Sequence, residues 1–227
     1  MTTAIIGIGN IGGRLARLLV TGGERVILAA RNEAEAATLA KQLGELASVA
    51  PVRKAIADAD VVVFAVWFDT VKQLIAEHAD LLEGKVVVDP SNPMKPDGKG
   101  GFARTLPDDQ SSGSAIAGLL PTGAHYVKAF GTLGAESLGP AANRTPERAV
   151  LFYATDDERA AAAIERLISA AGFDPVKAGG VRDAIRLEVP GDRGDLHQFG
   201  GLNGKLLSVD EARAAVAASG RSATQLR

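Results

Sequence analysis

The sequence predicts an α/β protein built on a doubly wound parallel sheet, with a small C-terminal α/β extension. Short apolar runs alternate with longer segments whose apolar residues recur at helical spacing. The first apolar run, residues 2–6, leads directly into the turn Gly7-Ile8-Gly9-Asn10-Ile11-Gly12, and a helix and a second strand follow. This order is typical of a Rossmann-type dinucleotide-binding unit. We expect that unit at residues 1–131, followed by a smaller portion at 132–227.

The remaining elements follow from the same periodicities. Residues 61–66 are apolar throughout, as expected for a parallel strand covered on both faces. Residues 89–114 hold several Pro and Gly without periodicity, which predicts a long functional loop at the carboxyl end of the sheet. Strands are expected at 2–6, 25–29, 48–50, 61–66, 86–89, 125–130, 149–154 and 173–178. Helices are expected at 11–21, 33–43, 52–57, 69–78, 115–120, 156–171, 181–189 and 209–220.

Capping patterns fix the starts of some of these helices. A Thr or Ser followed three residues later by Glu is the pattern of a capping box. The chain has two such pairs, Thr155 with Glu158 and Ser208 with Glu211. We expect Gly22, Gly44, Gly172 and Gly220 to end helices.

Composition excludes several classes of function. The 227 residues carry a net charge of −2, which gives no support to a nucleic-acid partner. Cysteine is absent, so disulfides, thiolate metal sites and cysteine nucleophiles are excluded, and no His or carboxylates stand at metal-ligand spacing. The longest apolar run, 61–68, is far shorter than a membrane span, and no basic segment precedes the first strand. We therefore expect a cytoplasmic protein with no metal and no membrane partner.

Each glycine of the first turn has its own physical role. Gly7 lets the chain turn sharply off the strand, and Gly9 lets a diphosphate approach the backbone. Gly12 lets the helix pack close to the sheet. The free N–H groups at the start of that helix favour an anion there.

The end of the second strand indicates which dinucleotide binds. An NAD site usually has a carboxylate there, but this strand ends Ala29-Ala30-Arg31-Asn32, with no acid before Glu33. Arg31 offers a planar fork of donors to a 2′-phosphate, which favours NADP(H). The alternative is that Arg31 is a solvated loop charge and Asn32 a helix cap that pairs with Glu35. Asn32 is able to serve both purposes.

The aromatic pair Trp67-Phe68 follows the strand at 61–66, at the edge where open α/β sheets bind ligands. Packing in a core or interface and a role beside the cofactor are equal alternatives for this pair. Gly131-Thr132 closes the strand at 125–130 at the same edge.

With these features in order, residues 1–190 resemble the NADPH-dependent reductases of coenzyme F420 and related dinucleotide-binding oxidoreductases. The matching segments are 8–12, Arg31, Val66-Trp67, 87–93, 98–102, 127–133, 178–181 and Leu187-Glu188. The chain departs from those proteins in three places. Glu35 replaces a basic residue, Gly131 replaces a larger polar one, and the segment 190–227 differs.

The resemblance implies hydride exchange between NADPH and the 5-deazaflavin coenzyme F420 as co-substrate. The deazaflavin would lie over the nicotinamide, between the sheet edge and the C-terminal portion. Motif and resemblance together predict cofactor contacts at Gly7, Ile8, Gly9, Asn10, Ile11, Gly12, Arg31, Asn32, Ala65, Val66, Trp67, Asn92, Pro93, Ala129, Gly131 and Thr132.

No convincing acid/base pair stands out. We expect His78 to be exposed, His125 to lie at the edge opposite the ligand, and Tyr126 and Tyr153 to be core residues. Lys128 and His197 remain as weak catalytic candidates, so we assign no catalytic residue. This scarcity suits direct transfer between two redox cofactors, where the protein orients stacked rings and excludes water.

Two alternatives stay open. In one, NADPH reduces a flavin, a quinone or a small imine or carbonyl instead of F420. In the other, the chain is an NADP(H)-binding regulatory module without turnover. The resemblance favours a homodimer, and the glycine-rich segment 190–205 is expected to be a lid or an arm exchanged between subunits.

Overall fold

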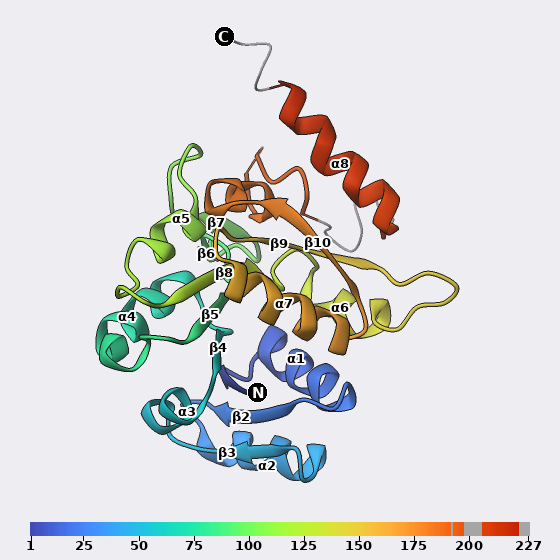
Figure 1. Ribbon diagram of the computed structural model, residues 1–227. Coiled ribbons are helices and arrows are strands. Elements are labelled where there is room, and N and C mark those ends of the chain that lie inside the picture. Colours follow the sequence, from blue (N-terminus) through green and yellow to red (C-terminus); the bar gives the residue numbers. More distant parts are fainter. Residues whose placement is uncertain (192, 198–205, 223–227) are drawn as a thin grey trace.

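A computed structural model describes residues 1–191, 193–197 and 206–222 of the chain. Its centre is an eight-stranded sheet in the order β10-β9-β8-β5-β4-β1-β2-β3 (Figure 1). The strands are β1 (Thr2–Ile6), β2 (Arg25–Ala29), β3 (Ala47–Val49), β4 (Val61–Phe64), β5 (Val86–Asp89), β8 (His125–Ala129), β9 (Val150–Ala154) and β10 (Asp174–Gly179). From β3 across to β8 all neighbours are parallel. The chain order reverses at β1, which lies between β2 and β4, so the predicted doubly wound Rossmann-type sheet is confirmed.

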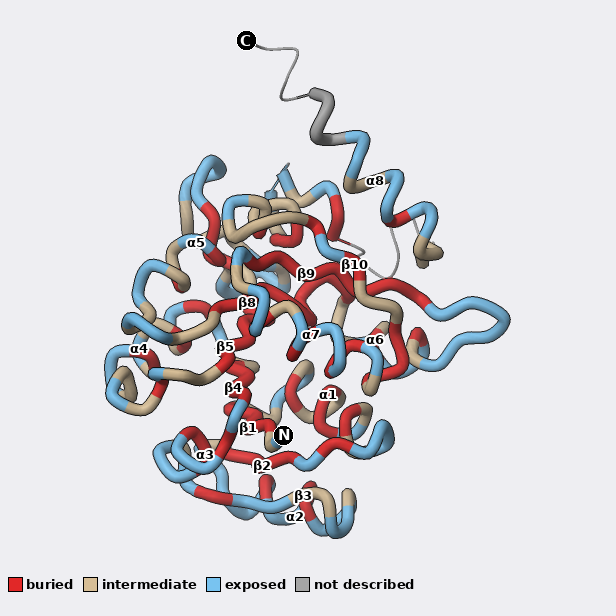
Figure 2. Tube along the Cα trace, viewed as in Figure 1, coloured by how far each residue is buried: buried red, intermediate tan, exposed pale blue. Residues whose placement is uncertain are grey.

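Helices cover both faces of this sheet. They are α1 (Asn10–Thr21), α2 (Glu33–Leu43), α3 (Val52–Asp58), α4 (Phe68–His78), α5 (Ser112–Ala117), α6 (Ala135–Ala141), α7 (Glu158–Ala170) and α8 (Val209–Ser222), with 3-10 turns η1 (Ala79–Leu81) and η2 (Val181–Leu187). One core receives side chains from α1, α2, α6 and α7, and the other from α3, α4 and α5. Successive residues of β1 alternate between them, since Ile5 packs in the first core and Ile6 in the second. Figure 2 shows the resulting continuous buried band along the strands.

The C-terminal strands β9 and β10 continue the same sheet but run antiparallel to its other strands. β9 runs antiparallel to β8, and only the pairs Lys128–Ala154 and Ala129–Tyr153 join them. The remainder of β9 therefore continues past the carboxyl end of β8. β10 is parallel to β9. A third, smaller core joins β9 and β10 to η2 and α8 through residues such as Phe152, Leu187 and Ala212.

Two predicted segments differ from the structure near the carboxyl edge. β4 ends at Phe64, not at Val66, because its partner β1 ends at Ile6, the residue opposite Phe64. The expected loop 89–114 contains an antiparallel hairpin, β6 (Met94–Pro96) and β7 (Phe102–Arg104). It also contains the start of α5, where Ser111 caps the helix by accepting a hydrogen bond from the Ser114 N–H at 3.2 Å.

Three further predictions are wrong in the C-terminal half, and one helix there was not predicted. Asp157, not Thr155, caps α7 by accepting from Ala160 N–H at 2.8 Å, because the Thr155 hydroxyl donates to the Tyr126 carbonyl and accepts from Asp157 N–H at 3.0 Å instead. Residues 181–187 form a 3-10 helix, since Glu188 leaves the helical path to bind α5. α8 continues past Gly220 to Ser222, as helices tolerate an internal Gly at about 1 kcal/mol. α6 was not expected, because Gly139 and Pro140 mask its helical pattern.

The Ser208–Glu211 capping box is confirmed, since Ser208 N–H donates to Glu211 at 3.0 Å and Glu211 N–H to the Ser208 hydroxyl at 3.4 Å. Within the described residues no helix has the length and apolar character that crossing a bilayer requires.

Candidate cofactor and acceptor site

The glycine turn after β1 has the geometry that its spacing predicts. Gly7 has φ +95°, a left-handed conformation that favours glycine. A Cβ on Gly12 would lie 1.9 Å from the Gly7 carbonyl oxygen and 3.0 Å from Cβ of Ala65, so α1 approaches the sheet more closely than any side chain permits. A Cβ on Gly9 would meet nothing within 4 Å. The open space over Gly9 is what a diphosphate approaching the backbone needs.

The start of α1 faces the same space. The helix begins at Asn10 and has no acidic residue in its first turn. Arg14 donates to the Asn10 carbonyl at 3.0 Å and to Glu136 of α6 at 2.8 Å, so this turn is tied to the C-terminal half. Ile8 and Ile11 pack against the core and so fix the position of the turn on the sheet. The residues present therefore fit a bound diphosphate.

Beyond β2, Arg31 is exposed and makes no hydrogen bond or ion pair within the described part of the chain. The expected cap is present, since the Asn32 amide oxygen accepts from Glu35 N–H at 3.3 Å and its amide nitrogen donates to the Glu35 carboxylate at 2.7 Å. A surface hollow of about 450 Å³ adjoins this corner between α1 and α2. Ile8 and Glu35 contribute to its lining.

The end of β4 lies directly beneath the glycine turn. A Cβ on Gly7 would lie 2.6 Å from both the Ala65 carbonyl and Cγ1 of Val66. The next two residues, Trp67 and Phe68, differ in exposure. Phe68 is 2% exposed and belongs to the core, with the Lys72 ammonium 4.8 Å above its ring, whereas Trp67 is 49% exposed.

The ends of β5 and β8 hold a buried polar cluster centred on Lys128, which is 1% exposed. Its Nζ donates to Asp89 at 2.9 Å, to the Ser112 hydroxyl at 3.0 Å and to the Ser91 carbonyl. Tyr126 also donates to Asp89, at 2.9 Å, and burial followed by the Asp89 charge raises its pKa well above the ordinary value. The three ammonium protons of Lys128 are thus all used within the protein, and its catalytic role stays a prediction.

A second buried carboxylate, Glu188, caps α5 from a distant part of the chain. One oxygen accepts from the Ser111 hydroxyl at 2.7 Å and from Gly113 N–H at 2.9 Å, and the other accepts from Ser112 N–H at 3.0 Å. Sequence reasoning assigned Glu188 no role. No local pattern signals this contact, because donor and acceptor lie about 75 residues apart.

Asn92 joins three segments at the carboxyl edge. Its amide oxygen accepts from Val189 N–H at 2.9 Å, and its amide nitrogen donates to the Gly131 carbonyl at 3.4 Å. Phe130 has φ +64°, a left-handed conformation that is unusual for a bulky residue and turns the chain at the end of β8. A Cβ on Gly131 would lie 2.7 Å from the Pro90 carbonyl oxygen, so this position has no room for a side chain.

The neighbouring groups of this edge are mostly buried. Ser91 and Thr132 are 6% and 1% exposed, and their hydroxyls have no hydrogen-bond partner among the described residues. Burial lowers the pKa of His197 to about 4, although a hydrogen bond to the Gly131 backbone acts in the opposite sense. The contact with Gly131 places His197 against the end of β8. Its low pKa means that the imidazole is neutral at pH 7.

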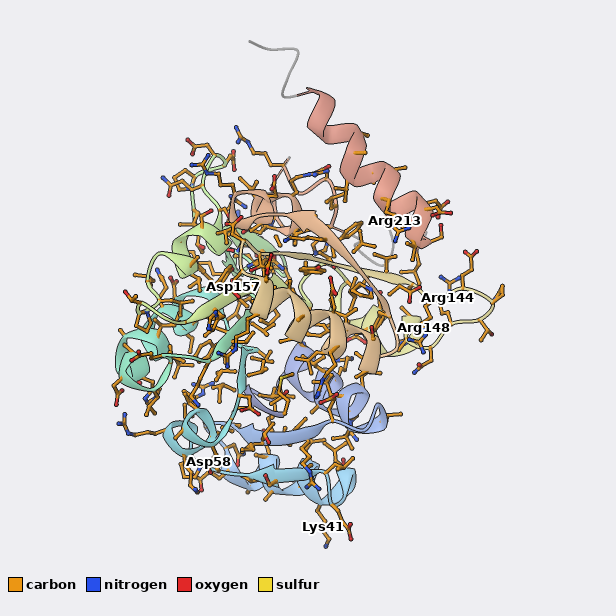
Figure 3. All side chains as sticks on the ribbon, in the orientation of Figure 1. Lys41, Asp58, Arg144, Arg148, Asp157 and Arg213 are labelled. Atoms are coloured by element: carbon orange, nitrogen blue, oxygen red, sulfur yellow. The ribbon has the colours of Figure 1, made fainter. Side chains whose placement is uncertain are left out.

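Other titratable candidates lie away from this edge. His125 opens β8, and its Nδ1 lies 2.6 Å from the carboxylate of Asp157, which Figure 3 labels at the start of α7. Tyr153 is buried, as expected, and its pKa is raised by desolvation and by Glu165. His78 at the end of α4 is only partly exposed. No group of His, Asp and Glu in the described ranges is arranged to hold a metal ion.

The structure thus brings most of the predicted cofactor residues to one edge of the sheet, along the ends of β1, β2, β4, β5 and β8. Arg31 and Asn32 stand at one end of this edge, and Asn92, Pro93, Ala129, Gly131 and Thr132 at the other. Pro93 and Ala129 are buried there. Whether each residue contacts a cofactor stays a prediction.

Solved structures share this fold. A hypothetical protein from Sinorhizobium meliloti is 30% identical, with a TM-score of 0.73 over 85% of this chain and 90% of that chain. A proposed F420-dependent NADP-reductase from Arthrobacter sp. FB24 is 23% identical, with a TM-score of 0.70 over 82% of this chain and 90% of that chain. At that identity the second likeness concerns the fold alone.

Two further similarities are found in sequence. Metalloreductase STEAP3 of Rattus norvegicus is 31% identical over 184 residues, which is 81% of this chain and 35% of that protein. The chain thus spans about a third of the length of this relative. Residues 2–93 match the family described as NADP oxidoreductase, coenzyme F420-dependent.

Proposed function

We propose that the chain transfers a hydride directly between NADPH and coenzyme F420, because residues 2–93 match the family described as NADP oxidoreductase, coenzyme F420-dependent. When bound, NADPH supplies the hydride. The backbone at Gly9 and the start of α1 would hold the diphosphate, and Arg31 the 2′-phosphate. The portion at 132–227 would complete the acceptor cleft, through Val189 and His197.

The observation that carries this proposal is the state of the ionisable side chains at the carboxyl edge. Asp89, Lys128 and Glu188 are buried, and they form hydrogen bonds to other protein groups. Reduction of a carbonyl needs a proton donor at the reacting oxygen. Hydride transfer to a deazaflavin leaves a negative charge delocalised over the ring system, which takes up one proton from solvent, so the protein has mainly to hold the two rings together. The edge is suited to the second task.

The direct test mixes the purified protein with NADPH and oxidised F420 and follows the visible absorbance of the deazaflavin. We expect this absorbance to fall only when both protein and NADPH are present. In the reverse reaction, we expect the absorbance to rise when NADP⁺ is mixed with reduced F420 and protein. NADH serves as the cofactor control. Tight NADPH binding without any exchange with F420 would reject the proposal.

Arg31→Ala tests the assignment of the 2′-phosphate. We expect NADPH affinity to fall about 10- to 100-fold, since a charge-assisted hydrogen bond contributes ~1.5–3 kcal/mol, and NADH affinity to change less than about twofold. Arg25→Ala is the matched control, because Arg25 is an exposed arginine at the other end of the same strand. Equal losses for both dinucleotides would show that Arg31 does not bind the phosphate.

The similarity to a protein named a metalloreductase favours a second candidate, NADPH-dependent reduction of an electron acceptor other than F420. The same assay with FMN, a quinone or an imine in place of F420 distinguishes the two. Light scattering of the same preparation tests the predicted homodimer.

A further inference from the structure

Two aromatic side chains stand exposed and in contact at the carboxyl edge. Trp67 is 49% exposed and Phe102 is 53% exposed. Their ring centroids are 6.0 Å apart and the planes are tilted by 40°. Such a pair is a normal aromatic contact, but it usually lies inside a protein. Contiguous exposed apolar surface of this kind marks a binding site more often than a single exposed side chain does.

Both rings stand on firm supports. Trp67 lies three residues after the end of β4 and occupies the N-cap position of α4, whose first residue, Phe68, is anchored in the core. Phe102 stands on β7, next to the tip of the β6–β7 hairpin. There the Asp97 carboxylate accepts from Lys99 N–H at 2.7 Å and from Gly101 N–H at 2.9 Å.

The base of the hairpin is fixed as well. Arg104 donates to the Pro190 carbonyl at 2.7 Å and to the Gln110 carbonyl at 2.6 Å. These contacts tie β7 to the segment that follows Glu188. Because both ends of the hairpin are hydrogen-bonded, the exposure of Phe102 is a property of the fold.

The pair lies where the second reactant must arrive. Trp67 is the residue after Val66, and Val66 lies beneath the glycine turn. Phe102 belongs to the hairpin that follows Asn92 at the end of β5. The rings therefore lie beside the path from the diphosphate turn toward the β5–β8 end, and they present apolar faces with no charged group of their own.

We propose that Trp67 and Phe102 form a stacking platform for the planar aromatic ring of the hydride acceptor. This inference rests on the proposed function, in which the acceptor is a second redox cofactor. Apolar ring faces bind a flat heterocycle by stacking, which tolerates different ring substituents. They offer nothing that would orient a small carbonyl or imine. The platform therefore selects acceptors with fused planar rings, and the dinucleotide binds elsewhere along the edge.

The test measures the dissociation constants of F420, FMN and NADP⁺ by equilibrium dialysis for wild type, Phe102→Ala and Phe102→Leu. Removing the ring is expected to weaken F420 and FMN five- to tenfold and to raise their KM similarly, with NADP⁺ affinity within twofold. Phe102→Leu keeps an apolar side chain and is expected to recover only part of the loss. Leu119→Ala is the matched control, because Leu119 is also apolar and 49% exposed but is not part of the aromatic pair.

Trp67 provides an independent readout because it is the single Trp of the chain. Bound F420 or FMN is expected to protect its fluorescence from acrylamide quenching, and NADP⁺ to give little protection. Unchanged acceptor affinity in Phe102→Ala would overturn the platform. So would an equal loss of NADP⁺ affinity, the same effect from Leu119→Ala, or a change in oligomeric mass, which would assign the rings to a subunit interface.

The two proposals fail separately. Phe102-dependent binding of F420 without hydride exchange would reject the proposed function and leave the platform standing. Hydride exchange with the same KM for F420 in wild type and Phe102→Ala would reject the platform and leave the proposed function standing.

Discussion

At the β1–β2 end of the carboxyl edge Arg31 is exposed and forms no ion pair among the described residues, whereas at the β5–β8 end Lys128 is 1% exposed and ion-paired with Asp89. The first end keeps its charge and its backbone N–H groups available to a ligand. The second end uses its charges to fix loops, since Lys128 holds the Ser91 carbonyl and Glu188 holds α5. Position at a ligand-binding edge therefore does not by itself make a charged residue a ligand contact. The four changes below test this difference.

Lys128→Ala is expected to have the largest effect. It leaves the Asp89 carboxylate buried beside Tyr126 without its cation, and breaking a buried pair costs about 3–5 kcal/mol. Urea denaturation measures the loss. Lys72→Ala removes an exposed pair with Asp69 and is expected to cost less than about 1 kcal/mol. Similar losses for the two variants would mean that the buried pair is not structural.

Glu188→Ala is expected to destabilise the fold by about 2–4 kcal/mol, because it removes the acceptor of three buried donors at the start of α5. Glu136→Ala, which removes a carboxylate that is mostly exposed, is the control. Denaturation again measures both. A cost below that of the control would show that water replaces the carboxylate at no loss.

His197 makes stability depend on pH. Its folded-state pKa of about 4 lies below the ordinary value of 6.5, so the unfolded chain binds more protons between these two values. The contribution of His197 to the free energy of unfolding is therefore fully present above pH 6.5. It is lost as the pH falls toward 4, and the total loss is about 2–3 kcal/mol. Unfolding free energies of wild type and His197→Gln, compared at intervals over this range, isolate the effect from that of the carboxylates. Parallel curves would contradict it.

Gly9→Ala is expected to leave the melting temperature unchanged, because its Cβ meets nothing within 4 Å. The methyl group does enter the space above the turn, so NADPH affinity is expected to fall about tenfold, or ~1.4 kcal/mol. Isothermal titration measures it. Gly134→Ala is the control, since a Cβ there also meets nothing. Full NADPH affinity in Gly9→Ala would move the diphosphate away from this turn.

The same difference between the β1–β2 end and the β5–β8 end of the edge determines which features the sequence predicts. The glycine turn and the strands beside it follow from local patterns, so Gly7, Gly12 and the Asn32 cap were predicted with their roles. Lys128 and Glu188 find partners many residues away, and no local spacing signals such contacts.

The errors in secondary structure have local causes. Each strand of the β6–β7 hairpin is three residues long, which is too short for alternation to be recognised. Thr155 and Asp157 are both good capping residues, and only the contact of Thr155 with β8 decides between them. Tertiary contacts choose between candidates that local propensity ranks equally.

The antiparallel junction of β8 and β9 has a mechanical consequence. The residues on its two sides share one core, in which Ile5 and Leu15 pack in the same cluster as Tyr153 and Leu167. A hinge between the N-terminal and C-terminal portions would have to open that core as well as the strand pairing. The two portions therefore behave as one rigid body, and the β6–β7 hairpin, which is hydrogen-bonded at its tip and at its base, keeps a fixed position on it.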